Sequence, residues 1–158
     1  MSKLEGFFEL PANVPKPREA IETIGEMVSK YRQPSQSSAP VAIDSRDGAD
    51  LIVVPRPVPY RLAEDIAHYL GADLDAAKWP DLPIRARVEV RGCRESADKL
   101  MDGIRGLLSS NMATNAFARR ENGDLIVVDC FRGHRGHGID TVLGFLEQHG
   151  ISYTAKFA

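Results

Sequence analysis

Three glycines, two arginines and two histidines occur within the eight-residue stretch FRGHRGHG at positions 131–138. Glycine lets the backbone approach a ligand closely, and arginine offers planar, bidentate hydrogen bonds to oxyanions. Histidine can donate to the same anion or carry a proton near neutral pH. Turning a chain requires no such composition, so we predict an anion-binding loop. Its candidate binding residues are Arg132, Gly133, His134, Arg135, Gly136, His137 and Gly138.

A helix is predicted directly after this loop, over 139–149, because apolar residues recur there at helical spacing. The first amides of a helix lack partners, and the helix dipole favours an anion at that end. We therefore expect the loop to contact an anionic target. The candidates are a nucleic-acid backbone, a phosphorylated ligand and an acidic patch on a partner protein.

The same stretch also permits a metal site. Cys130, His134 and His137 form the pattern C-x3-H-x2-H, whose side chains suit zinc. Three ligands are fewer than a closed structural site needs, and zinc patterns usually contain paired C-x2-C or H-x3-H units. We therefore expect no metal and no other cofactor.

Catalysis is a third interpretation, in which His134 and His137 act as general base and acid in phosphodiester cleavage of RNA. The sequence contains no G-x-S-x-G, H-E-x-x-H or P-loop motif. We therefore predict a non-enzymatic binding or regulatory protein that contacts a macromolecular partner. A small His-dependent ribonuclease or other phosphodiester hydrolase, with or without a metal, is the alternative.

Two further arginines, Arg119 and Arg120, lie beside a predicted hairpin turn and join the set of anion- or partner-binding candidates. Sheets that recognise RNA usually stack bases on aromatic residues of their central strands. Here the central strands carry Val, Ile and Leu, and Phe117 is the nearest aromatic residue. Any nucleic acid is thus expected to bind through phosphate contacts.

Two segments of the chain, 42–54 (AIDSRDGADLIVV) and 116–128 (AFARRENGDLIVV), are closely similar. Such a repeat indicates one supersecondary unit used twice. The repeats align at an offset of 74 positions, whereas Gly71 and Gly150, which are predicted to end the following helices, align at 79. The second copy therefore gains about five residues, and these fall in the Gly/Arg/His loop. Inserted loops on a rigid scaffold often carry function.

The second half of the chain alternates strand and helix patterns. The predicted elements are a strand at 84–91, a helix from 94, strands at 116–120 and 124–130, a helix at 139–149 and a strand at 151–157. The run at 125–128 is apolar on both sides, which predicts a strand inside the sheet. This order is typical of the split βαβ, ferredoxin-like plan, with an antiparallel sheet and both helices on one face.

The first half repeats this order less completely. It contains a short strand at 7–10, a helix at 17–31, a hairpin at 41–54, a helix at 61–70 and a connector at 72–83 without a clear final strand. We predict an α+β fold of tandem ferredoxin-like units, in which 1–83 forms a degenerate unit and 84–158 a complete one, within one compact globule. A single mixed α+β domain is the alternative. The residues predicted to be buried are Ile21, Ile24, Val53, Ile66, Val88, Leu100, Ile104, Ile126, Val128, Leu143 and Leu146.

The composition is that of a globular protein, with 158 residues, 43% apolar and 27% charged. No apolar run approaches the ~20 residues that span a bilayer, and the N-terminus lacks the apolar region of a secretory signal. Cys93 and Cys130 are too few for a disulfide framework. We therefore expect a cytoplasmic protein without a membrane partner. A net charge of −2 argues against a general nucleic-acid coat, and exposed sheet edges favour a homodimer.

Overall fold

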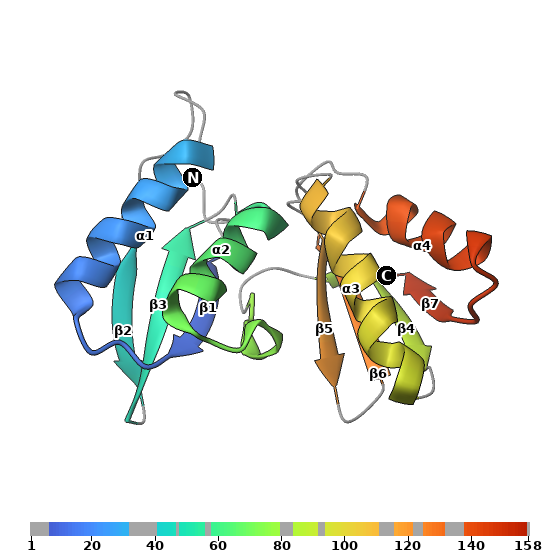
Figure 1. Cartoon of the computed structure of the whole chain (residues 1–158), viewed down its shortest axis with the longest axis horizontal. Helices are drawn as coiled ribbons and strands as arrows, with labels where there is room; N and C mark the ends of the chain where they lie inside the picture. The colour runs from blue at the N-terminus through green and yellow to red at the C-terminus, as the bar shows by residue number, and fades with distance from the viewer. Residues whose placement is uncertain are drawn as a thin grey trace. The chain divides into compact units, whose positions relative to one another are not determined.

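The computed structural model describes residues 7–31, 41–46, 48–55, 58–79, 84–91, 94–110, 116–121, 125–131 and 138–157. The fold is α+β, and the described residues form two antiparallel sheets and four α-helices (Figure 1). Contacts within the chain divide it into two compact units, Met1–Leu82 and Pro83–Ala158. Within the described ranges, no helix is long and apolar enough to cross a membrane.

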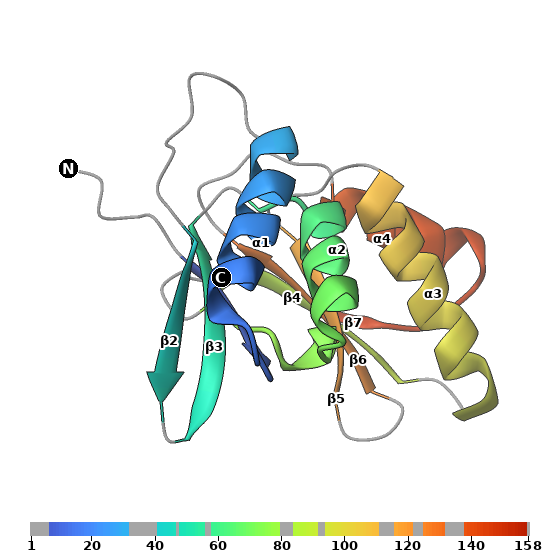
Figure 2. The same cartoon turned by 60° about the vertical axis from the view of Figure 1, so that its left-hand side comes forward.

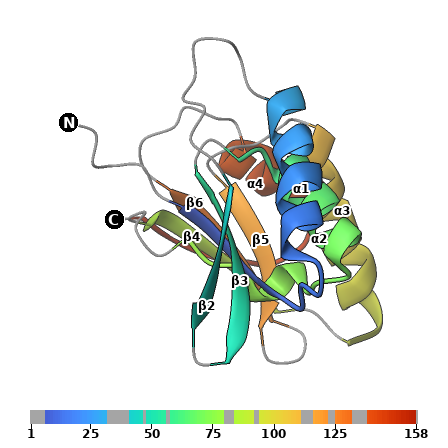
Figure 3. The same cartoon turned by 90° about the vertical axis from the view of Figure 1, so that its left-hand side faces the viewer.

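The N-terminal unit is a three-stranded antiparallel sheet covered by two helices. Its elements are β1 (Phe7–Ala12), α1 (Pro17–Tyr31), β2 (Ala42–Arg46), β3 (Ala49–Pro55), α2 (Tyr60–Leu70) and the short 3-10 helix η1 (Leu74–Ala76). The strands lie in the order β1-β3-β2. Figure 3 shows α1 and α2 side by side on one face of this sheet.

Alternation along β1 and β3 places the core of this unit on one sheet face. Phe8 pairs with Val54 and Leu10 with Ile52, and all four side chains are fully buried. Register partners share a sheet face, so these residues form one apolar layer. The helices add Ile24, Val28, Leu62 and Ile66.

The outer edge of β1 is paired at one isolated position. Glu9 and Lys78 form an antiparallel bridge in which each backbone N–H donates to the other residue's carbonyl oxygen at 2.9 Å. The next residue, Trp79, packs its ring 5.3 Å from that of Phe8. The segment predicted as a plain connector therefore contains η1 and a one-residue contact with the sheet.

The C-terminal unit is a four-stranded antiparallel sheet with two helices. Its elements are β4 (Ile84–Arg91), α3 (Arg94–Ser110), β5 (Ala116–Glu121), β6 (Leu125–Phe131), α4 (Gly138–Gln148) and β7 (Thr154–Phe157). The strand order is β5-β6-β4-β7, which confirms that the LIVV strand lies inside the sheet. Figure 2 shows α3 and α4 on the same side of these strands. The final strand is shorter than predicted, because 151–153 do not pair with β4.

Register pairing also separates the two faces of this sheet. Val88 pairs with Val128 and Val90 with Ile126, and none of these side chains is exposed. The alternate residues of β4, which are Arg87, Glu89 and Arg91, lie on the opposite face. Every residue of β6 is buried, so its polar member, Asp129, requires a partner inside the fold.

The prediction of buried residues is largely confirmed. Burial is confirmed for Ile24, Ile66, Val88, Leu100, Ile104, Ile126, Val128 and Leu146. It is wrong for Ile21, which is 37% exposed because the buried stripe of α1 runs through Ala20, Ile24 and Val28. Val53 is half-buried, since it lies on the sheet face away from the helices, and Leu143 is half-buried beside the buried Val142.

A glycine follows the second helix of each unit, α2 and α4, as predicted. Gly71 has φ 63° and Gly150 has φ 64°, a left-handed conformation that glycine adopts at little cost. The N–H of Gly71 donates to His68 O at 3.2 Å, and the N–H of Gly150 donates to Glu147 O at 3.1 Å. These bonds satisfy helix carbonyls that would otherwise lack a donor.

Two glycines of α3 differ in what surrounds them, which gives a matched stability test. A Cβ at Gly106 meets nothing within 4 Å, whereas one at Gly103 lies 2.8 Å from Cζ of Phe145 on α4. We expect Gly106→Ala to raise the free energy of unfolding by about 0.5–1 kcal/mol through helix propensity. Gly103→Ala should raise the free energy of unfolding by less, because the ring of Phe145 must move to make room for the added methyl group. Urea unfolding measures both, and equal gains would contradict close packing of α3 on α4.

Candidate functional site

The predicted anion-binding loop joins β6 to α4. Positions 132–137 lie outside the described residues, while Phe131 ends β6 and Gly138 begins α4. The loop thus starts at a fully buried strand and leads into a helix N-terminus, as the sequence predicts. Of the other predicted site residues, Arg119, Arg120 and Cys130 are described.

The expected insertion of about five residues is too large. The connection between strand and helix spans 56–59 in the N-terminal unit and 132–137 in the C-terminal unit. The reason is that β3 ends one residue after Val54, whereas β6 continues for three residues beyond Val128. Part of the segment assigned to the insertion is therefore strand, and the connection that remains is only slightly longer.

The N-terminus of α4 carries an acidic residue of its own. Asp140 lies in the first turn and is exposed. A carboxylate there interacts favourably with the helix dipole and reduces the attraction of that helix end for an external anion. The helix N-terminus alone is therefore a weaker anion site than the sequence predicts.

Arg119 and Arg120, on β5, both contact carboxylates of the same unit. Arg120 forms an ion pair with Asp98 of α3. Arg119 bonds to Asp129 and to Glu121. Their role as anion-binding residues stays a prediction, and an external anion would have to compete with these carboxylates.

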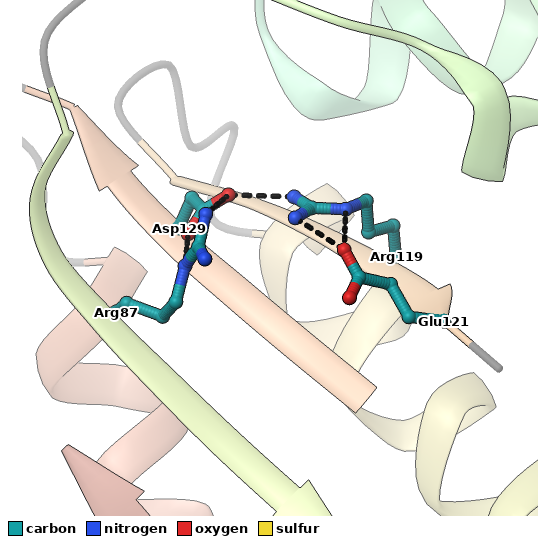
Figure 4. A network of polar contacts seen from close by, with 4 residues as sticks. All are labelled: Arg87, Arg119, Glu121 and Asp129. Atoms are coloured by element: carbon teal, nitrogen blue, oxygen red, sulfur yellow. Dashed lines mark hydrogen bonds and ion pairs between the residues drawn. The ribbon is translucent and has the colours of Figure 1, made fainter. Parts of the chain in front are cut away.

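Figure 4 shows the network that holds Arg119. It lies on the sheet face away from the helices and links β4, β5 and β6 through Asp129. Nε of Arg87 donates to Oδ1 of Asp129 at 2.6 Å, and its Nη2 donates to Oδ2 at 3.3 Å. Nη1 of Arg119 donates to Oδ2 at 2.6 Å, while its Nε and Nη2 donate to Oε2 of Glu121 at 3.0 and 2.7 Å.

Burial explains why Asp129 needs cationic partners. Asp129 is 2% exposed, and an unpaired carboxylate in such a place is costly. Hydrogen bonding to Asp129 raises the pKa of Arg87 above the usual arginine range. Burial acts against the charged form of Arg119, but its hydrogen bonds to Asp129 and Glu121 outweigh burial and raise its pKa as well. Both arginines therefore stay charged, and the four side chains together are neutral.

This network was not among the sites predicted from the sequence. The signal was present, since Arg87 lies on the polar face of an alternating strand and Asp129 interrupts an apolar one. Their pairing depends on the register of β4 against β6, in which Arg87 lies directly opposite Asp129. The arrangement joins three strands and leaves little free charge for a ligand, so we interpret it as structural.

Cys130, the first member of the predicted metal pattern, is buried. It lies on the helix-facing side of β6, so the adjacent Asp129 points to the opposite face and cannot join it at one metal ion. Burial raises the pKa of the Cys130 thiol, Asp140 and Asp129 raise it further, and Arg85 opposes them. The other members, His134 and His137, fall outside the described residues. Within the described part, no group of three or more His, Cys, Asp or Glu could hold a metal.

This environment predicts an unreactive thiol. Cys93→Ser leaves Cys130 as the sole cysteine. Because the thiolate is the reactive form, we expect a thiol-specific chromogenic reagent to modify Cys130 slowly at pH 8 in the folded chain and rapidly in urea. Rapid modification under native conditions would show that the helix-facing side of β6 opens readily.

The chain was compared with models of known protein families and with curated proteins, and neither comparison found a match.

Proposed function

We propose that this chain is a non-enzymatic binding or regulatory protein and that the loop 131–138 contacts an anionic surface of a macromolecular partner. One observation carries the proposal: this strand-to-helix connection concentrates arginine, histidine and glycine between a buried strand and a helix N-terminus. A rigid scaffold of this kind suits a binding loop. Since Arg119 and Arg120 already contact carboxylates, Arg132 and Arg135 are the principal contact residues.

We also propose that the units 1–83 and 84–158 are two copies of one ferredoxin-like plan. The order β1-β3-β2 matches β4-β6-β5 once β7 is set aside. The bridge between Glu9 and Lys78 lies on the outer edge of β1, where β7 pairs with β4 in the other unit. It is therefore a candidate remnant of the final strand. The outer strands of both sheets offer edges for a homodimer, which analytical ultracentrifugation of the purified chain tests.

The partner is identified by capture from native lysate. Wild-type chain and the double variant Arg132→Ala plus Arg135→Ala are immobilised, and the retained protein and nucleic acid are both analysed. We expect a partner that wild type retains and the double variant loses. Equal retention by the two would refute the role of this loop.

The alternative is a ribonuclease that uses His134 and His137. Labelled RNA and DNA are incubated with purified chain, with and without EDTA. If the chain only binds its partner, neither RNA nor DNA should be cleaved. Cleavage that is abolished by His134→Ala or His137→Ala would refute the binding proposal in favour of the ribonuclease. Loss of cleavage in EDTA would indicate that the reaction requires a metal.

A further inference from the structure

A hollow of about 220 Å³ lies in the C-terminal unit, lined by Glu89, Arg91, Ser152, Tyr153 and Thr154. It forms because β7 is shorter than β4. The ladder between the two strands begins at the pair Glu89 and Thr154 and covers only 86–89 of β4. Figure 1 shows the chain passing from α4 into this short strand. The hollow is open to solvent, and its size suits a small molecule.

The two charged groups of the hollow have opposite signs. Glu89 and Arg91 are two residues apart on β4, so their side chains share one face, about 6–7 Å apart along the strand. Among the residues that the structure describes, neither takes part in an ion pair. Arg87, two residues earlier on the same face, is instead bound to Asp129.

Residues 152–154 complete the wall. The Tyr153 hydroxyl does not face the two charges, because it donates to Oε2 of Glu147 on α4 at 2.8 Å, on the helix side of the sheet. Ser152 and Thr154 are exposed at the hollow. Thr154 pairs with Glu89 in the ladder, so its side chain shares the sheet face of the two charges, and a hydroxyl can donate or accept a hydrogen bond.

We propose that this hollow binds a free α-amino acid in its zwitterionic form. Glu89 accepts hydrogen bonds from the ammonium group, and Arg91 donates a bidentate pair to the carboxylate. A simple anion is repelled by Glu89 and a polyamine by Arg91, whereas a zwitterion complements both. The hollow shares no residue with the loop 131–138, and Phe131 pairs with Ile84 at the other end of β4 from Arg91. The proposal therefore does not depend on the function of that loop.

The test is an amide chemical-shift titration of the full-length chain with each of the twenty amino acids. At least one is expected to give saturable shifts at Arg91 and Thr154. Its N-acetyl and methyl ester derivatives, which each lack one charge, should bind at least about tenfold more weakly. Glu89→Gln and Arg91→Gln should weaken binding by a similar factor. Arg85→Gln, on the same strand but outside the hollow, serves as the matched control and should leave the affinity unchanged.

Three results would overturn the proposal. The first is an absence of saturable shifts with every amino acid up to about 10 mM, a range that reaches weak millimolar affinity. The second is equal binding of the charged and blocked derivatives. The third is unchanged affinity in both hollow variants, whose folding is checked by the dispersion of the same spectra.

Discussion

Replacing Asp129 by alanine is expected to lower the free energy of unfolding by about 2–4 kcal/mol, the largest effect we predict for a single substitution. The carboxylate is buried, and it joins Arg87 of β4 to Arg119 of β5. Its removal leaves Arg87 without its carboxylate partner, whereas Arg119 keeps only its bonds to Glu121. Those side chains are 35% and 20% exposed, so water compensates part of the loss. Urea unfolding followed by circular dichroism measures the change.

A substitution at Glu121 shows whether the loss of stability depends on burial of the carboxylate. Glu121 also binds Arg119, but its side chain is 38% exposed, and exposed ion pairs contribute about 0–1 kcal/mol. Glu121→Gln should therefore cost less than about 1 kcal/mol. If Asp129→Ala were as mild as Glu121→Gln, the network would not stabilise the fold and Asp129 would be better explained as a functional residue.

The second large effect concerns the partner. Once capture has identified it, the double variant Arg132→Ala plus Arg135→Ala should weaken binding by about 1–3 kcal/mol for each charged hydrogen bond lost. For a nucleic-acid partner, the affinity should also fall with salt, and the variant should show a shallower dependence because fewer phosphates are contacted. Fluorescence anisotropy at several salt concentrations measures both quantities.

The control removes the same charge from the other unit. Arg18 and Arg61 lie on the exposed faces of α1 and α2, so Arg18→Ala plus Arg61→Ala matches the loop variant in net charge. It should leave affinity unchanged. Neither variant should alter stability by more than about 0.5 kcal/mol per site. A clear loss of thermal stability in the loop variant would show that the loop serves the fold.

Hydrophobic periodicity was sufficient to predict the elements. The strand at 84–91 and the helix at 17–31 have the predicted bounds, because alternation and helical spacing are local properties of the chain. The final strand was overestimated, since 151–153 follow the alternating pattern without a neighbour to pair with. Burial was misjudged at Ile21 for a related reason, because the edge of a helical stripe depends on what packs against it.

The candidate site was predicted from composition, and composition contains no information about partners. Arg119 and Arg120 looked like free cations beside a turn, yet both contact carboxylates. Asp98 lies 22 residues before Arg120 in the chain, and Asp129 is 42 residues after Arg87. Such pairs meet only when separate elements are packed. The hollow beside Glu89 was missed for the same reason.

The sequence by itself determined the order of strands and helices, the glycines that end the second helices and the inner position of the LIVV strand. These follow from side-chain periodicity and backbone preference, which act over a few residues. Only the tertiary structure decided which charges are neutralised and which remain available. Strand register sets those pairings, and a shift of one residue in register would move every side chain to the other face. In this register Arg87 lies opposite the buried Asp129, whereas Glu89 and Arg91 line the open hollow.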